Sequence, residues 1–111
     1  MTERIMYVQL KTGHDTDAGP AWIAKVNFNR TWKTLRFHGR TLRRMHSGMD
    51  GYGRDANFYD MDSGEMYWVS GPKRDRTDGR YSSLQPLVDA DARADYEAFL
   101  AGGTLPGRDR R

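Results

Sequence analysis

Basic and aromatic side chains are the residues of this chain whose types and spacing suit a chemical task, the binding of a polyanion. Residues 25–46 contain seven Lys or Arg and no Asp or Glu, and a second basic stretch follows at residues 73–80. Cations hold phosphates, and flat rings stack on bases, so these stretches favour binding of RNA or single-stranded DNA. The predicted nucleic-acid-binding residues are Arg36, Arg40, Arg43, Arg44, Lys73, Arg74, Arg76, Arg80 and Tyr81.

Further rings are candidates for stacking between the two basic stretches, and they are Trp32, Tyr52, Tyr67 and Trp68. Trp22, Phe28 and Phe37 are better explained as core, as Trp68 also is, because large aromatic rings are usually buried. The net charge of +3 and the pI near 9.4 are too mild to identify a nucleic-acid-binding protein by themselves. The hypothesis therefore requires the arginines to converge on one face.

A protein-interaction module is the alternative from another functional class. Asp75 and Asp78 lie among the cations of the loop at residues 71–85, and such mixed charge suits a protein surface at least as well as a polyanion. Exposed strand edges accept a strand from another chain. An adaptor or a homodimer would fit this pattern.

Catalytic and metal-binding patterns are missing from the sequence. The chain has no cysteine, no Gly-x-Ser-x-Gly nucleophile turn and no glycine-rich phosphate loop. The spacing of His14, His38 and His46 matches no standard zinc arrangement. We therefore predict no catalytic residue, no cofactor and no metal ligand, and we do not expect an enzyme.

The first half of the sequence predicts four strands. Residues 5–11 are rich in β-formers, and residues 21–29 alternate with Trp22, Ala24, Val26 and Phe28 on one face. Shorter strands are predicted at residues 33–37 and 40–45, joined by a turn at His38 and Gly39.

The second half predicts a hairpin and a helix. Strands at residues 58–61 and 65–70 flank a turn at residues 62–64, after a glycine-rich loop at residues 46–57. A helix is expected at about residues 90–101, with Asp89 or Asp91 as its cap and Gly102 and Gly103 at its end. Its apolar side, which carries Tyr96, Phe99 and Leu100, should pack on the sheet.

Together these elements predict one mainly β (α+β) domain at residues 1–103, followed by a flexible tail at residues 104–111. The expected architecture is a small antiparallel curled sheet or an SH3-like barrel of four to six strands with one C-terminal helix. An open sheet with the helix across one face is the competing arrangement. No apolar run approaches a membrane span, and Met1 to Arg4 lead directly into a strand, so we expect a cytoplasmic protein without membrane contact.

Several short runs resemble a family of short uncharacterised bacterial proteins: YVQLKTG at residues 7–13, GPAWI at 19–23, HGRTLR at 38–43 and GEMYWVSGPK at 64–73, followed by Asp78 and Arg80. Some members of that family resemble sequences labelled 1-deoxy-D-xylulose-5-phosphate synthase. Such an enzyme needs large α/β domains around thiamine diphosphate, and 111 residues are too few to form them. The resemblance therefore implies a shared fold and assigns no catalytic residue.

Overall fold

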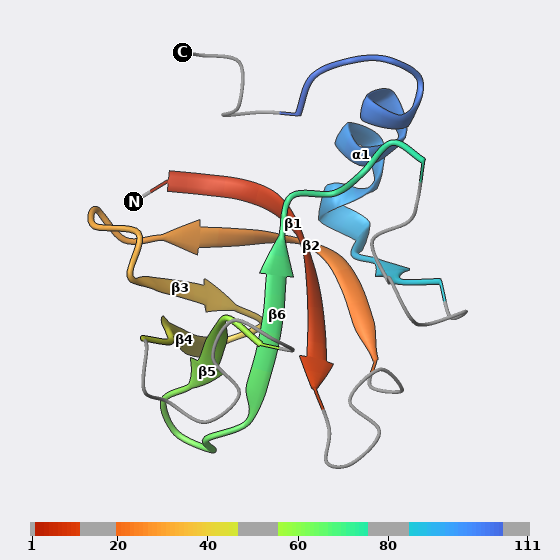
Figure 1. Ribbon diagram of the computed structural model, residues 1–111. Coiled ribbons are helices and arrows are strands. Elements are labelled where there is room, and N and C mark those ends of the chain that lie inside the picture. The colour runs from red at the N-terminus through yellow and green to blue at the C-terminus, as the bar shows by residue number, and fades with distance from the viewer. Residues whose placement is uncertain (1, 12–19, 47–55, 76–84, 106–111) are drawn as a thin grey trace.

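The computed structural model describes residues 2–11, 20–46, 56–75 and 85–105, in which strands are followed by a helix near the C-terminus (Figure 1). The strands are β1 (Thr2–Lys11), β2 (Ala21–Phe28), β3 (Thr34–Phe37), β4 (Arg40–Arg44), β5 (Phe58–Asp60), β6 (Met66–Ser70) and β7 (Leu87–Val88). A 3-10 turn, η1 (Ala90–Ala92), leads into helix α1 (Arg93–Leu100). Within the described ranges, no helix has the length and apolarity that a membrane span requires.

Strands β1 to β6 form a closed antiparallel barrel. Each strand pairs with the next one along the chain, and β1 pairs both with β2 and with β6, so the sheet closes on itself. The short β7 joins β2 in parallel at one side. The prediction of a small barrel is therefore confirmed, and the open sheet is wrong. The SH3-like description of that barrel stays a prediction.

The barrel interior holds the main hydrophobic core, because alternate side chains of each strand point inward. In β2 the inward row is Trp22, Ala24, Val26 and Phe28, as the period-two pattern predicts. Most of these side chains are fully buried, and Trp22 is half-buried at one end of the row. The other strands contribute Met6, Val8, Leu10, Leu35, Phe37, Leu42, Phe58, Tyr67 and Val69.

A second core lies outside the barrel, between α1 and the outward faces of β1 and β2. Tyr96 of α1 packs here with Ile5, Tyr7 and Ile23. The predicted packing of the helix on the sheet is confirmed, with Phe99 and Leu100 at its edge. This core also reaches past the helix to the buried Leu105, which lies in the segment predicted as a tail. The rest of that segment, residues 106–111, lies outside the described residues.

The helix begins differently from the prediction. Asp89 precedes η1, but its side chain makes no capping hydrogen bond. One carboxylate oxygen of Asp89 lies instead 2.7 Å from Nε2 of His38, in the turn between β3 and β4. Neither predicted acidic cap is therefore used, and the start of the helical segment is joined to the barrel by a side-chain pair. Gly102, with a φ of +112°, follows the helix as predicted.

The hairpin of β5 and β6 is built around the buried carboxylate of Asp60. Its Oδ1 accepts hydrogen bonds from the backbone N–H groups of Asp62 (2.8 Å) and Ser63 (3.2 Å), while Arg40 donates to Oδ2 at 2.7 Å. Gly64 completes the turn at a φ of +79°, which confirms the predicted hairpin. Burial by itself raises the pKa of Asp60, but the hydrogen bond from Arg40 and those from the two backbone groups lower the pKa below its ordinary value.

Candidate nucleic-acid interface

The four arginines predicted on residues 36–44 point in different directions. Arg36 and Arg43 lie on the outward face of the barrel, since their register partners include Thr41 and Thr34 on that face. Arg40 and Arg44 belong to the inward row that contains Leu42, and they stand at opposite ends of β4. The four arginines of this stretch therefore lie in three places: Arg36 and Arg43 on an outer wall of the barrel, and Arg40 and Arg44 at its two ends.

Arg40 is the member of this group whose charge is already paired. It donates to the buried Asp60 and lies 3.9 Å from Glu65. The hydrogen bond to Asp60 raises the pKa of Arg40 above its ordinary value, and the hydroxyl of the nearby Tyr67 adds to the effect. Arg40 therefore stabilises the β5–β6 hairpin.

The second predicted basic stretch lies beside the helix. Arg74 donates to the backbone carbonyls of Phe99 (3.2 Å) and Gly103 (2.6 Å), and its guanidinium stacks 4.6 Å from the centre of the Phe99 ring. Arg74 thus holds the C-terminal end of α1, on the side of the barrel away from β3 and β4 (Figure 1). Lys73 is exposed next to it. The remaining predicted residues, Arg76, Arg80 and Tyr81, lie outside the described residues.

One end of the barrel brings together arginines and aromatic rings from five parts of the chain. We call this group the mouth cluster, and it consists of Arg4, Phe28, Trp32, Arg44 and Phe58. Two guanidinium groups lie over rings, Arg4 at 5.0 Å from the centre of Trp32 and Arg44 at 4.7 Å from that of Phe58. The rings of Phe28 and Trp32 are 4.6 Å apart. Arg44 also donates from Nε to the carbonyl of Trp32 at 3.2 Å.

The turn between β2 and β3 presents Trp32 at this end of the barrel. Asn29 organises the turn, since its side-chain oxygen accepts hydrogen bonds from the backbone N–H groups of Lys33 (3.0 Å) and Thr34 (3.2 Å). Trp32 adopts a φ of +65°, a left-handed conformation that is uncommon for a residue with a large side chain. The indole remains 37% exposed, whereas Phe28 beneath it is buried. Backbone strain at an exposed aromatic ring is typical of a functional position.

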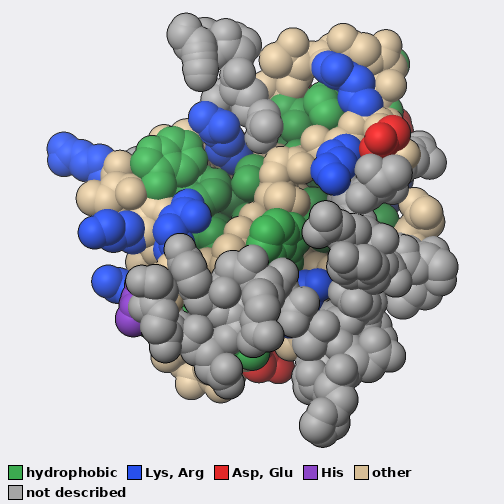
Figure 2. All heavy atoms as spheres, viewed as in Figure 1, with side chains coloured by type: hydrophobic (Ala, Val, Ile, Leu, Met, Phe, Trp, Pro, Cys, Tyr) green, Lys and Arg blue, Asp and Glu red, His purple; other side chains and the backbone are tan. Residues whose placement is uncertain are grey.

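The surface around the mouth cluster is positively charged. Among the described residues, no carboxylate lies within ion-pair distance of six cations, and these are Arg4, Arg30, Lys33, Arg36, Arg43 and Arg44. Figure 2 shows Lys and Arg side chains around a hydrophobic patch on the side of the molecule where the β2–β3 turn lies. Because they are unpaired, these charges remain available to an anionic ligand.

Sequence reasoning missed Arg4, which no basic stretch includes. The signal was present in the alternation of β1, where Met6, Val8 and Leu10 face the interior and Arg4 continues the same row. The predicted stacking ring of Tyr67 is buried in the core, and the half-buried Trp68 packs toward α1. Tyr52 lies outside the described residues. Trp32 is therefore the exposed ring that the described structure offers.

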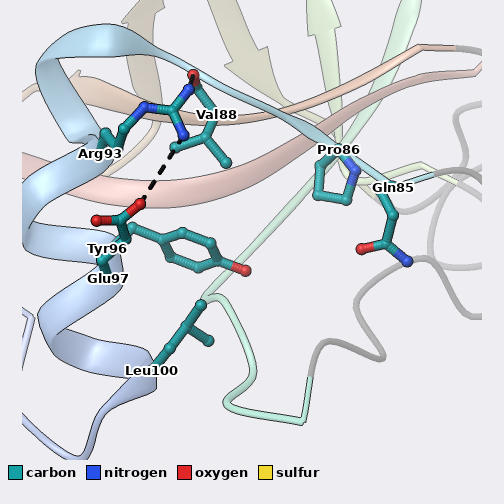
Figure 3. Close-up of a pocket in the computed structure, with 7 residues that line it drawn as sticks. All are labelled: Gln85, Pro86, Val88, Arg93, Tyr96, Glu97 and Leu100. Carbon is teal, nitrogen blue, oxygen red and sulfur yellow. Dashed lines mark hydrogen bonds and ion pairs between the residues drawn. The ribbon is translucent and has the colours of Figure 1, made fainter.

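A separate cavity lies between β7 and α1 on the other side of the barrel (Figure 3). Its volume is about 230 Å³, and Tyr96 and Leu100 form its apolar wall opposite Pro86. Arg93 and Glu97 form an ion pair of 3.9 Å at its edge, and Arg93 also reaches the carbonyl of Val88 at 3.4 Å. The neighbouring Leu87 is 64% exposed.

Comparison with protein-family models, with curated proteins and with solved structures gives no match to this chain.

Proposed function

We propose that this protein binds single-stranded nucleic acid at the mouth cluster and along the neighbouring outer wall of β3 and β4. The observation that carries the proposal is the exposed Trp32, whose ring contacts Arg4 and whose backbone carbonyl accepts from Arg44. Neither arginine has a carboxylate partner among the described residues. Cations and a solvent-facing ring are the two components that bind unpaired strands without reading their sequence.

The geometry favours single strands over duplex. Stacking on an indole requires a base whose face is free, and bases in a duplex are already stacked on one another. The outer wall adds Arg36 and Arg43 as diagonal neighbours, with Tyr59 directly opposite Arg43 across β4 and β5. A strand that stacks a base on Trp32 can therefore extend its phosphates across this wall.

Replacement of Trp32 tests the proposal directly. We expect Trp32→Asn to weaken binding of a fluorescein-labelled 12-nucleotide RNA by about 5- to 150-fold, because stacking contributes about 1–3 kcal/mol per base. Asparagine suits the left-handed backbone at this position, so the fold should be retained. Trp32→Phe keeps a flat ring and should retain most of the affinity. Anisotropy titrations at 50 mM salt measure both variants.

Two results would contradict the proposal. One is an absence of RNA and single-stranded DNA binding by the unmodified protein at low salt. The other is equal affinity of Trp32→Asn and the unmodified protein, in a variant whose circular dichroism and thermal unfolding are unchanged. Heparin carries charge but no bases. If it bound as tightly as RNA, stacking would play no part in binding.

A protein-interaction module is the second candidate, and the specific observation favouring it is the cavity beside the exposed Leu87. An apolar side chain from a partner could enter that cavity. The test is capture of a partner from nuclease-treated extract by the unmodified protein but not by Leu87→Asp. Loss of the captured protein on nuclease treatment would instead indicate a nucleic-acid bridge.

A further inference from the structure

Arg4 is held at the mouth of the barrel in a way that ordinary surface arginines are not. It stands opposite Val26 on the inward face of β1, and its guanidinium is covered by the Trp32 ring. Its Nε is buried and has no hydrogen-bond partner among the described residues. The two terminal nitrogens are also without a described partner but are not buried, so they remain open to a ligand.

Arg44 is also fixed by two contacts, one of them to the backbone of the same tryptophan. Its Nε is occupied by the carbonyl of Trp32, and its plane rests on the Phe58 ring. These contacts leave its terminal nitrogens without a partner in the described structure. Two guanidinium groups are thus held at Trp32, that of Arg4 against the indole and that of Arg44 at the backbone carbonyl, and each has hydrogen-bond donors available.

We infer that Arg4, Trp32 and Arg44 form a subsite for one nucleotide of the bound strand, with the base on the indole and the adjoining phosphates on the two guanidinium groups. This inference rests on the proposed function and specifies which residues contact the ligand most closely. It assigns Arg4 as a phosphate-binding residue. Arg36 and Arg43, whose side chains make no hydrogen bond, ion pair or ring contact among the described residues, then provide general attraction along the wall.

Phosphate is the group that this arrangement suits. A guanidinium offers planar pairs of N–H donors that match two oxygens of one phosphate, and a lysine ammonium does not reproduce that geometry. Because rings and a backbone carbonyl already hold Arg4 and Arg44, less side-chain freedom is lost when they bind. Exposed arginines without such contacts lose more side-chain conformational entropy when they bind a phosphate.

Charge-conserving substitutions separate this subsite from general attraction. We expect Arg4→Lys to weaken binding of a 12-nucleotide RNA by about tenfold or more, because the planar donor pair is lost. Arg93→Lys is the matched control and should change affinity by about twofold or less, since Arg93 lies on α1, outside the proposed binding surface. The salt slope should be unchanged in both variants because the charge is kept. Equal effects of the two substitutions would overturn the subsite.

Titration with adenosine monophosphate distinguishes failure of the subsite from failure of the proposed function. The Trp32 indole N–H resonance, assigned with Trp32→Phe, should shift with adenosine monophosphate and much less with adenosine. If RNA binds but neither Arg4→Lys nor the nucleotide shows these effects, the subsite is wrong and strand binding remains. If the nucleotide shifts Trp32 but RNA does not bind, strand binding is wrong and the nucleotide subsite remains. If the nucleotide does not shift Trp32 and RNA does not bind, both the subsite and strand binding are wrong.

Discussion

The salt dependence of RNA binding can be worked out from the cations that the structure leaves unpaired. Six such side chains belong to the mouth cluster, the β2–β3 turn and the outer wall. Each contact with a phosphate of a single strand contributes about −0.7 to the slope of log affinity against log salt, so six contacts give a slope of about −4. Raising the salt concentration from about 50 to 200 mM should then reduce affinity by about 300-fold.

Removal of two wall arginines provides the perturbation. In Arg36→Ala/Arg43→Ala four cations remain, so the slope should fall to about −3 and the same change in salt should cost about 50-fold in affinity. The control is Lys73→Ala/Arg93→Ala, which removes the same charge from α1 itself and from the neighbour of Arg74, the residue that bonds the end of α1. We expect the salt slope of this control to match that of the unmodified protein, because those residues lie away from the bound RNA.

Anisotropy titrations of one labelled RNA at four or more salt concentrations would measure all three slopes. Equal slopes for the two double variants would refute the reasoning, because attraction would then depend on total charge and not on location. A slope near zero for the unmodified protein would also refute it. Circular dichroism spectra of the variants would establish that each is folded.

Three further predictions concern stability, measured as the free energy of unfolding in urea. Asp60→Asn should be less stable than the unmodified protein at pH 7. Because the folded state lowers the pKa of Asp60 below its ordinary value of 3.8, this stabilisation is present above that value and is lost as pH falls through the lowered pKa. The free energies of unfolding of the two proteins should therefore converge on acidification, and an unchanged difference would contradict this. Arg74→Ala should cost about 1 kcal/mol through the lost carbonyl bonds at the end of α1, whereas Arg43→Ala should cost less than about 0.5 kcal/mol, and equal costs would contradict the assigned role of Arg74. Gly64→Ala should cost about 1–2 kcal/mol because of its positive φ alone, since an added Cβ meets no atom within 4 Å, and Gly64→Asn should cost less; the reverse order would count against this explanation.

Local patterns were sufficient to predict most of the elements. The alternation from Trp22 to Phe28 identified both β2 and its inward face, and the sequence Asp62-Ser63-Gly64 identified the β5–β6 hairpin. These features are determined by residues close together in the sequence, through the alternation of side chains along a strand and the residue preferences of turns. Closure of the barrel depends instead on pairing of β1 with β6, which no local period encodes.

The candidate site was predictable only in part. The basic stretch at residues 25–46 correctly drew attention to β3 and β4, but it gave no means of separating Arg40, which is paired with Asp60, from Arg44 in the mouth cluster. Both occupy the inward row of β4, and the difference arises from which end of the barrel each reaches. Arg4 enters the cluster because the barrel brings the start of β1 beside the β2–β3 turn, an encounter that spacing in the sequence does not reveal.

Pairing of the first barrel strand with the sixth has a consequence for how the molecule is made. Tyr7 pairs with Ser70, so the barrel cannot close until the ribosome has released β6 as well as β1. Bringing together segments so far apart in the chain is entropically unfavourable and slows folding. We therefore expect β1 and β2 to associate early as a hairpin and the barrel to be completed late, with the nascent chain exposing the free edge of β1 until β6 arrives.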